Sequence, residues 1–93
     1  MIQSFKNKAT EKVFQAEYTS RLPHDIQKTA YRRLLALHAA TSLEDLHVLP
    51  GNRLEKLKGD RAGQYSIRIH DQWRVCFDWI NENAENAEIV DYH

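Results

Sequence analysis

The sequence predicts an α+β fold, in which two N-terminal helices pack on one face of a mainly antiparallel, twisted sheet. Apolar residues recur every three or four positions up to residue 37, which is the spacing of a helix with one buried face. After Pro50 and Gly51 they alternate with polar residues instead, which is the spacing of a half-buried strand. Helices followed by a run of strands are typical of α+β proteins.

The N-terminal half is expected to hold a short strand over residues 2–5 and a brief helix over residues 10–17. Pro23 suits the first turn of a second helix. That helix carries four apolar residues on one face, namely Ile26, Ala30, Leu34 and Leu37. Thr41 and Glu44 have the spacing of a capping box, which predicts one further helical turn before the chain breaks.

The C-terminal half is expected to form four strands. Alternating apolar residues indicate a central pair of strands over residues 65–69 and 73–79. A strand over residues 53–58 is expected before this pair, and one over residues 87–91 after the polar loop 81–86. The helices then cover one face of the sheet, and the other face is expected to be free for function.

The register of the central hairpin brings two arginines together. A turn through residues 70–72 buries the large apolar side chains on one face, in the pairs Ile69–Trp73, Ile67–Val75 and Tyr65–Phe77. The same register places Arg68 opposite Arg74 on the other face. Like charges in such a pair repel by up to about 1 kcal/mol, and a phosphate bound by both guanidinium groups would remove this repulsion. The alternative is a salt bridge from either arginine to Asp71, Asp78 or Glu88.

Composition excludes several classes of protein. Hydrophobic residues make up 42% and charged residues 28% of the 93 residues, so we expect a single globular domain over residues 1–93. The single cysteine, Cys76, excludes an internal disulfide and a zinc finger, and no metal site is expected. The chain shows neither a secretory signal nor a run long enough to cross a bilayer, so we expect it in the cytoplasm, away from membranes.

Charge is unevenly distributed although the formal net charge is zero. Residues 53–74 contain six basic and three acidic residues, whereas residues 75–93 contain five acidic residues and no lysine or arginine. A neutral chain can therefore carry a basic patch. The basic residues of this segment are Arg53, Lys56, Lys58, Arg61, Arg68 and Arg74.

Four segments together resemble one family, the HigB toxins of the RelE superfamily, also called plasmid maintenance killer proteins. They are GNRLEKLKGDR at 51–61, GQYSIR at 63–68, QWRVCF at 72–77 and the terminal DYH at 91–93. The resemblance extends over essentially the whole chain. It implies a RelE-like fold and cleavage of messenger RNA in the decoding site of a translating ribosome. It also implies neutralisation by a HigA-type antitoxin with a helix-turn-helix, which makes operator DNA an indirect partner.

The resemblance also assigns roles to residues. Lys58 and Arg74 match family positions that contact the scissile phosphate. The catalytic C-terminal segment of the family is matched by Asp91, Tyr92 and His93. Glu55 stands where one member of the family has a catalytic histidine, which leaves the identity of the general base open.

The chemistry expected of these residues needs no metal ion or other cofactor. The ribose 2′-hydroxyl attacks the adjacent phosphorus, with Lys58 and Arg74 stabilising charge on the phosphate, helped by Arg68. Further phosphate contacts are expected from Arg53, Lys56 and Arg61. His93 is the acid-base candidate, oriented by Asp91, while Tyr92 stacks on a base or holds the ribose, and Glu55 or a ribosomal group is the base.

Two other functions stay open at this point. A ParE-like toxin would act on DNA gyrase and would use no nuclease site, and the pairing of Lys58 and Arg74 with a terminal Asp-Tyr-His weighs against it. A non-catalytic module would dock RNA or a protein on the sheet. Binding without cleavage would favour that module.

Overall fold

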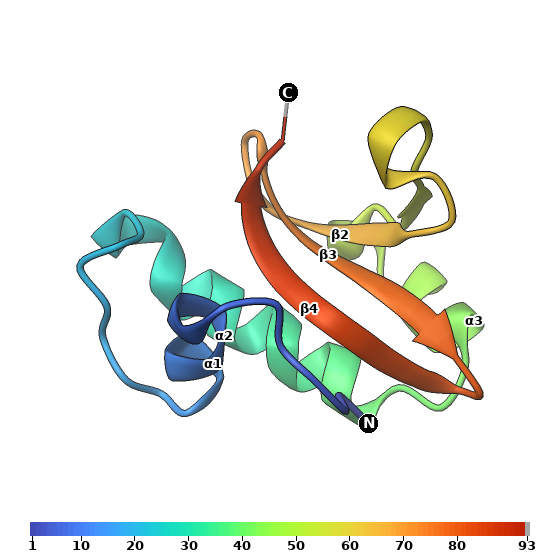
Figure 1. The fold of residues 1–93 in the computed structure, drawn as a ribbon, viewed down its shortest axis with the longest axis horizontal. Helices are drawn as coiled ribbons and strands as arrows, with labels where there is room; N and C mark the ends of the chain where they lie inside the picture. The colour runs from blue at the N-terminus through green and yellow to red at the C-terminus, as the bar shows by residue number, and fades with distance from the viewer. Residues whose placement is uncertain (93) are drawn as a thin grey trace.

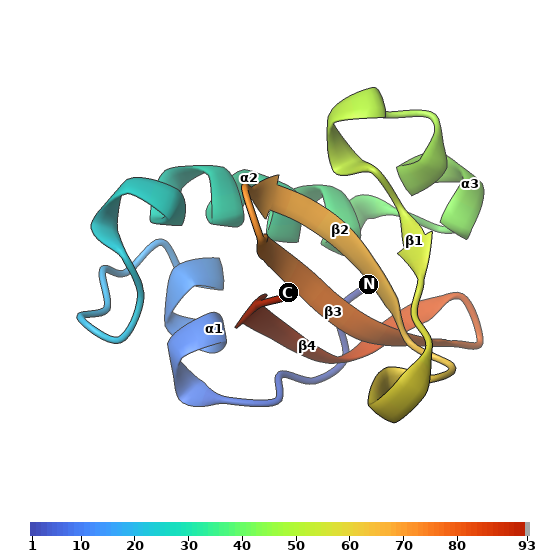
Figure 2. The same ribbon diagram turned by 90° about the horizontal axis from the view of Figure 1, so that it is seen from above.

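A computed structural model describes residues 1–92, and its two longer helices form a layer on one side of a four-stranded sheet (Figure 1). The sheet has the order β1-β2-β3-β4, with every neighbouring pair antiparallel (Figure 2). The helices are α1 (Lys8–Phe14), α2 (His24–Ala39) and α3 (Leu43–His47), with 3-10 turns η1 (Pro50–Asn52) and η2 (Gly59–Arg61). The strands are β1 (Glu55–Lys56), β2 (Tyr65–His70), β3 (Trp73–Ile80) and β4 (Asn83–Asp91).

Helix α2 confirms the predicted apolar face. Its four inward residues, Ile26, Ala30, Leu34 and Leu37, are all buried and belong to the main core cluster. Burial of each large side chain of this kind contributes about 1.5–3 kcal/mol. Pro23 is the N-cap rather than a residue of the first turn. No helix within residues 1–92 is long and apolar enough to cross a membrane.

The two elements before α2 differ in extent from the prediction. Helix α1 begins at Lys8 because the side chain of Asn7 accepts a hydrogen bond from the Thr10 amide at 2.9 Å and so caps the helix. The expected strand over residues 2–5 is reduced to two parallel bridges, from Ile2 to Ala84 and from Phe5 to Ala87. The N-terminal segment therefore lies along the outer edge of β4.

The predicted capping box is wrong by one residue. Ser42 caps α3 by accepting from the Asp45 amide, and the Asp45 carboxylate accepts from the backbone amide of Ser42 in return. Both spacings fit a capping box, and Ser42 is the residue with the extended backbone that an N-cap requires.

The central hairpin confirms most of the predicted register. Tyr65 pairs with Phe77, Ile67 with Val75 and Arg68 with Arg74, all as expected. The expected Ile69–Trp73 pair is wrong, since His70 pairs with Trp73 and the register shifts between Arg68 and His70. The turn is one residue shorter than predicted, and Asp71 has the positive φ of 50° that suits a tight hairpin turn.

The outer strands differ from the prediction in opposite directions. Strand β1 is shorter than expected and spans only Glu55–Lys56. Strand β4 begins at Asn83, inside the segment predicted as a loop, because Asn81 and Glu82 alone form the turn. Both turn residues have positive φ, which gives the twist that joins two strands tightly.

The two faces of the sheet have different roles. Ile67, Val75 and Phe77 face the helices and are fully buried in the main core. By alternation, Arg74 lies on the opposite face, away from the helix layer. The turn η2, yellow in Figure 1, stands on that side of the sheet as well.

Candidate active site

Arg74 is a buried charged residue on the face of the sheet away from the helices. It lies in β3, and only 10% of its side chain is exposed. Its Nε donates to Ser66 Oγ at 2.6 Å, and its Nη2 donates to the backbone carbonyl of Arg53 at 2.7 Å. Glu55 Oε1 lies 4.0 Å from Nη1, which has no nearer partner among the residues that the structure describes. The guanidinium plane is thus fixed, with one edge turned to Glu55.

The hydrogen bond from Arg74 to the Arg53 carbonyl depends on an unusual backbone conformation of Arg53. Arg53 follows η1 with φ 43° and ψ 56°, the left-handed conformation that few residues other than glycine adopt. Asn52, just before it, is almost fully buried and donates from Nδ2 to the Leu46 carbonyl at 3.2 Å. This turn directs the Arg53 carbonyl to Arg74, so the backbone of Arg53 contributes to the site directly.

The expected Arg68–Arg74 pair is present, and the alternative salt bridges to Asp71, Asp78 or Glu88 do not form within residues 1–92. Of the three acidic residues considered, none pairs with Arg74, which instead faces Glu55. Arg68 is half-buried, and its carbonyl accepts from Nε of Arg33 on α2 at 2.8 Å. The charge of Arg74 is therefore balanced from β1, and the sheet pair itself is tied to the helix layer through the Arg68 backbone.

The other basic residues of segment 53–74 do not gather into one patch. Lys56 pairs with Tyr65 in the sheet, and Glu55 pairs with Ser66. Because side chains alternate along a strand, Lys56 and Glu55 lie on opposite faces of the sheet. Arg61 is held by an ion pair to Glu88 at 3.2 Å and a hydrogen bond to Gln64 at 3.1 Å.

Lys58 stands at the start of η2, and its side chain is exposed. Its backbone carbonyl accepts from the Arg61 amide at 3.4 Å, which closes the 3-10 turn. No ion pair or hydrogen bond of its ammonium group occurs within residues 1–92. The position of Lys58 is consequently set by the backbone of its own turn.

The C-terminal segment runs along the start of β3. Asp91 pairs with Trp73, and the Tyr92 amide donates to the Gln72 carbonyl at 2.8 Å. By alternation, Tyr92 falls on the same side of the sheet as Arg74, and Asp91 on the side of Trp73. His93, the predicted acid-base residue, lies outside the described residues.

The expectation of a free sheet face is wrong at the centre of the sheet. Ser66 and Cys76 pair across β2 and β3 there and are fully buried. Burial raises the pKa of the Cys76 thiol, an effect that Glu88 adds to and that Arg61 and Arg74 partly offset. Cys76 is therefore a buried thiol whose raised pKa disfavours the reactive thiolate form.

Sequence reasoning missed Ser66, the Arg53 carbonyl and the pairing of Glu88 with Arg61. Ser66 had a signal, because strand alternation places it on the face of Arg68 and diagonal to Arg74. Glu88 had a weaker one, as an acidic residue on the same face as Cys76. The Arg53 carbonyl had none, since a left-handed arginine cannot be anticipated from its side chain.

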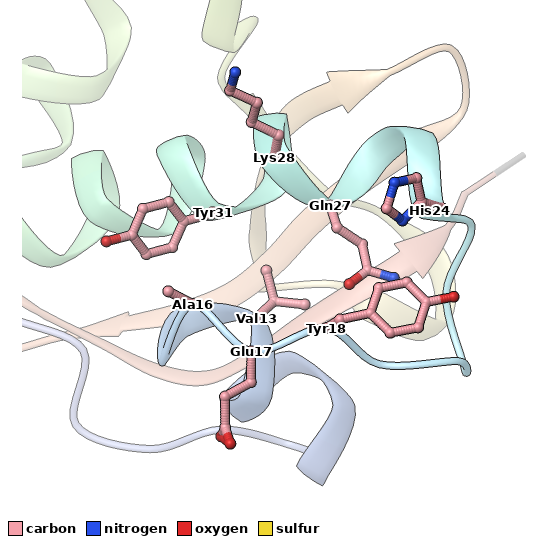
Figure 3. Close-up of a pocket in the computed structure, with 8 residues that line it drawn as sticks. All are labelled: Val13, Ala16, Glu17, Tyr18, His24, Gln27, Lys28 and Tyr31. Atoms are coloured by element: carbon pink, nitrogen blue, oxygen red, sulfur yellow. The ribbon is translucent and has the colours of Figure 1, made fainter.

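A separate hollow of about 370 Å³ lies in the helix layer, between α1, the loop after it and α2 (Figure 3). Val13, Tyr18, Gln27 and Tyr31 are among its lining residues, and the side chain of Lys28 extends from α2 away from them (Figure 3). It holds no pair of arginines and lies on the other side of the sheet from Arg74. Within residues 1–92 no group of three or more metal-ligating side chains occurs.

Comparison with known proteins gives consistent matches. Residues 3–93 match the HigB-like toxin family, described as the RelE-like toxin of the type II toxin-antitoxin system HigB. Toxin HigB-1 of Vibrio cholerae is 38% identical over 88 residues, covering 94% of this chain and 93% of that protein. Endoribonuclease HigB of Proteus vulgaris is 37% identical over 93 residues, covering 100% of both.

The fold has a solved counterpart. A structure described as the YoeB-YefM complex from Staphylococcus aureus matches with a TM-score of 0.61 and 24% identity, covering all of this chain and 95% of that one. This match shows the shared fold, and the family match covers nearly every residue. The chain belongs to the HigB family, the RelE-like toxins of type II toxin-antitoxin systems.

Proposed function

We propose that this toxin is an endoribonuclease that cleaves messenger RNA in the decoding site of a translating ribosome. The supporting observation is Arg74, a nearly buried guanidinium held at two nitrogen atoms, with its third facing the carboxylate of Glu55. A charge fixed in this way can stabilise a phosphorane without reorganising during the reaction. The relative named as an endoribonuclease matches over its full length.

The reaction is a transfer within the RNA chain. The ribose 2′-oxygen forms a bond to the adjacent phosphorus while the bond from phosphorus to the 5′-oxygen breaks. The proton of the 2′-hydroxyl goes to a base, and the leaving 5′-oxygen receives a proton from an acid. The products are a 2′,3′-cyclic phosphate and a 5′-hydroxyl end, and no metal ion is required.

Each step has a proposed residue. Arg74 and Lys58 stabilise the phosphorane, and Arg68 helps to bind the phosphate. Glu55 is the base, because its carboxylate lies 4.0 Å from Arg74 Nη1 and so near a phosphate bound there. His93 gives the proton to the leaving oxygen. Asp91 orients it from the end of β4, where its strand position faces the opposite side of the sheet from Arg74. Tyr92, on the same side of the sheet as Arg74, stacks on a base.

The ribosome supplies what the chain lacks. Lys58 and Glu55 are exposed, and the groups proposed for catalysis come from all four strands and from the start of η2. Substrate held in one geometry by the decoding site would complete this arrangement. Free RNA is therefore a poor substrate. As a toxin-antitoxin protein the chain has an antitoxin partner, and we propose a HigA-type helix-turn-helix protein through which operator DNA is reached.

Primer extension on a defined message in a purified translation system tests this function. Wild-type protein is expected to cut at ribosome-occupied codons, and Lys58→Ala, Arg74→Ala, Glu55→Gln and His93→Gln to reduce cutting by about 100-fold or more. Lys12→Ala is the control, because this exposed cation lies on α1 in the helix layer. Translation arrest with an intact message would indicate binding without cleavage. Unaffected translation would point to gyrase instead.

A further inference from the structure

Residues Leu57 to Gln64 form a closed turn that connects β1 to β2 and carries Lys58. The Leu57 amide donates to the Gln64 carbonyl at 2.8 Å, and the Gln64 amide donates to the Arg61 carbonyl at 3.0 Å. The Arg61 amide in turn donates to the Lys58 carbonyl. The position of Lys58 is therefore coupled, through one backbone hydrogen bond, to the position of Arg61.

Arg61 connects this turn to β4. Its Nη1 lies 3.2 Å from Glu88 Oε1 and donates also to Gln64 Oε1. The two side chains are only 32% and 21% exposed, so solvent and salt screen this ion pair less than a surface pair. With both contacts made by one guanidinium nitrogen, Arg61 joins the turn and β4 at a single point.

Glu88 belongs to the same ladder as Arg74. It pairs with Cys76, which is two residues from Arg74 in β3 and on the same face. Arg61, Glu88 and Arg74 all act electrostatically on the buried Cys76, as expected if they surround it. The ion pair with Glu88 therefore fixes the position of the turn that carries Lys58 relative to β3, the strand that carries Arg74.

We propose that the Arg61–Glu88 ion pair is a positioning contact that holds the turn of Lys58 in place relative to Arg74. This inference rests on the proposed function, in which both cations bind the scissile phosphate. Arg61 then acts through Lys58 instead of contacting RNA itself. Glu88, in the acidic C-terminal part of the chain, is needed for catalysis although it touches no substrate.

Charge reversal tests this contact in the full-length protein. We expect Arg61→Glu and Glu88→Arg each to speed hydrogen exchange of the Leu57, Ala62 and Gln64 amides, which donate the backbone bonds of the turn. Single-turnover cleavage on saturating ribosomes should fall roughly 10- to 100-fold, the cost of misplacing a catalytic group by about 1 Å. The double reversal should restore slow exchange and most of the cleavage rate.

Two further variants distinguish loss of the ion pair from misfolding and from a general effect of charge. Glu88→Gln removes the charge with little change of shape and should reproduce the loss if a reversed charge prevents folding. The control is Lys8→Glu, which breaks the exposed ion pair of Lys8 with Glu11 on α1 and should change neither exchange in the turn nor cleavage. A positioning role lowers the saturated rate and leaves ribosome affinity unchanged, whereas direct RNA contact weakens binding.

Three results would overturn the inference. If hydrogen exchange of the turn amides stays slow in all single variants, the ion pair does not hold the turn in place. Faster exchange with an unchanged cleavage rate would separate the turn from catalysis. A double reversal that restores slow exchange but not cleavage would show that Arg61 contacts RNA directly. A wild-type protein that cleaves nothing overturns the proposed function and the catalytic part of this inference, while exchange still shows whether the ion pair holds the turn.

Discussion

The guanidinium of Arg74 shows how the fold holds a charge at a place where little water reaches it. Nε donates to Ser66, Nη2 donates to a backbone carbonyl and Nη1 faces Glu55. A buried donor without an acceptor costs about 1–3 kcal/mol. Ser66 is fully buried beside Arg74, so its hydroxyl is the acceptor that water cannot readily replace.

Ser66→Ala should therefore affect both stability and activity. We expect the free energy of unfolding in urea to fall by about 1–3 kcal/mol, because Nε of Arg74 loses its acceptor. The cleavage rate should fall as well, since the guanidinium plane is no longer fixed. Ser66→Thr retains the hydroxyl and should keep most of the rate.

Cys76→Ala is the matched control for this change. Cys76 pairs with Ser66 across the same buried face and makes no hydrogen bond to Arg74 within the described residues. Its removal should lower stability through lost packing and leave the cleavage rate unchanged. Equal rate losses for Ser66→Ala and Cys76→Ala would argue that the serine merely fills space.

At this scale the sequence predicts side-chain positions better than side-chain partners. The period of two in β2 and β3 was enough to pair Arg68 with Arg74. The partners of Arg74 come from segments that only the tertiary fold brings near, such as Glu55 and the carbonyl of Arg53. Backbone acceptors of this kind have no side-chain signature.

Among the secondary-structure elements, α3 links the helix layer to η1 and depends on its N-terminal cap. The Asp45 carboxylate accepts from the Thr41 amide at 2.9 Å, from the Thr41 hydroxyl at 3.1 Å and from the Ser42 amide at 3.3 Å. These bonds, the one from the Thr41 amide first, lower the pKa of Asp45 below its ordinary value. The cap is therefore strongest when Asp45 is ionised.

Acid should weaken this cap in a defined pH range. A lowered folded-state pKa contributes stability that is fully present above the unfolded-state pKa and is lost as the pH falls through the folded-state value. We expect the amide signals of residues 43–47 to report this loss in an NMR titration, and Asp45→Asn to abolish the step. Glu44→Gln, which removes the neighbouring carboxylate, should retain it. An unchanged step in Asp45→Asn would assign the transition to another group.

The elements also show where sequence patterns stop being informative. The apolar stripe of α2 was predictable because four inward residues repeat at helical spacing. The end of the β2–β3 hairpin was not, because its two-residue turn is compatible with the Arg68–Arg74 pair only through the register shift between Arg68 and His70, which the alternation does not reveal. The cap at Ser42 was missed for a similar reason, as two capping boxes overlap there.

The molecule as a whole separates stability from chemistry by face. The large apolar side chains of α2, β2 and β3 lie together on the helix side, whereas Arg74, Ser66 and the anchor at Glu88 lie on the other side. The sheet separates these two groups of side chains and contributes residues to both. Loss of a core side chain should therefore lower stability without moving the residues proposed to bind phosphate.

Leu34→Ala and Leu35→Ala test this separation on adjacent residues of α2. Leu34 is fully buried in the core, whereas Leu35 is 42% exposed. We expect Leu34→Ala to lower the free energy of unfolding by about 2–5 kcal/mol, and Leu35→Ala to change it by less than about 0.5 kcal/mol. Cleavage by the folded fraction, measured well below the melting temperature, should match wild type in both. A rate that falls in proportion to the lost stability would mean that the helix layer shapes the phosphate site through the sheet, because a core cavity would then be felt at Arg74.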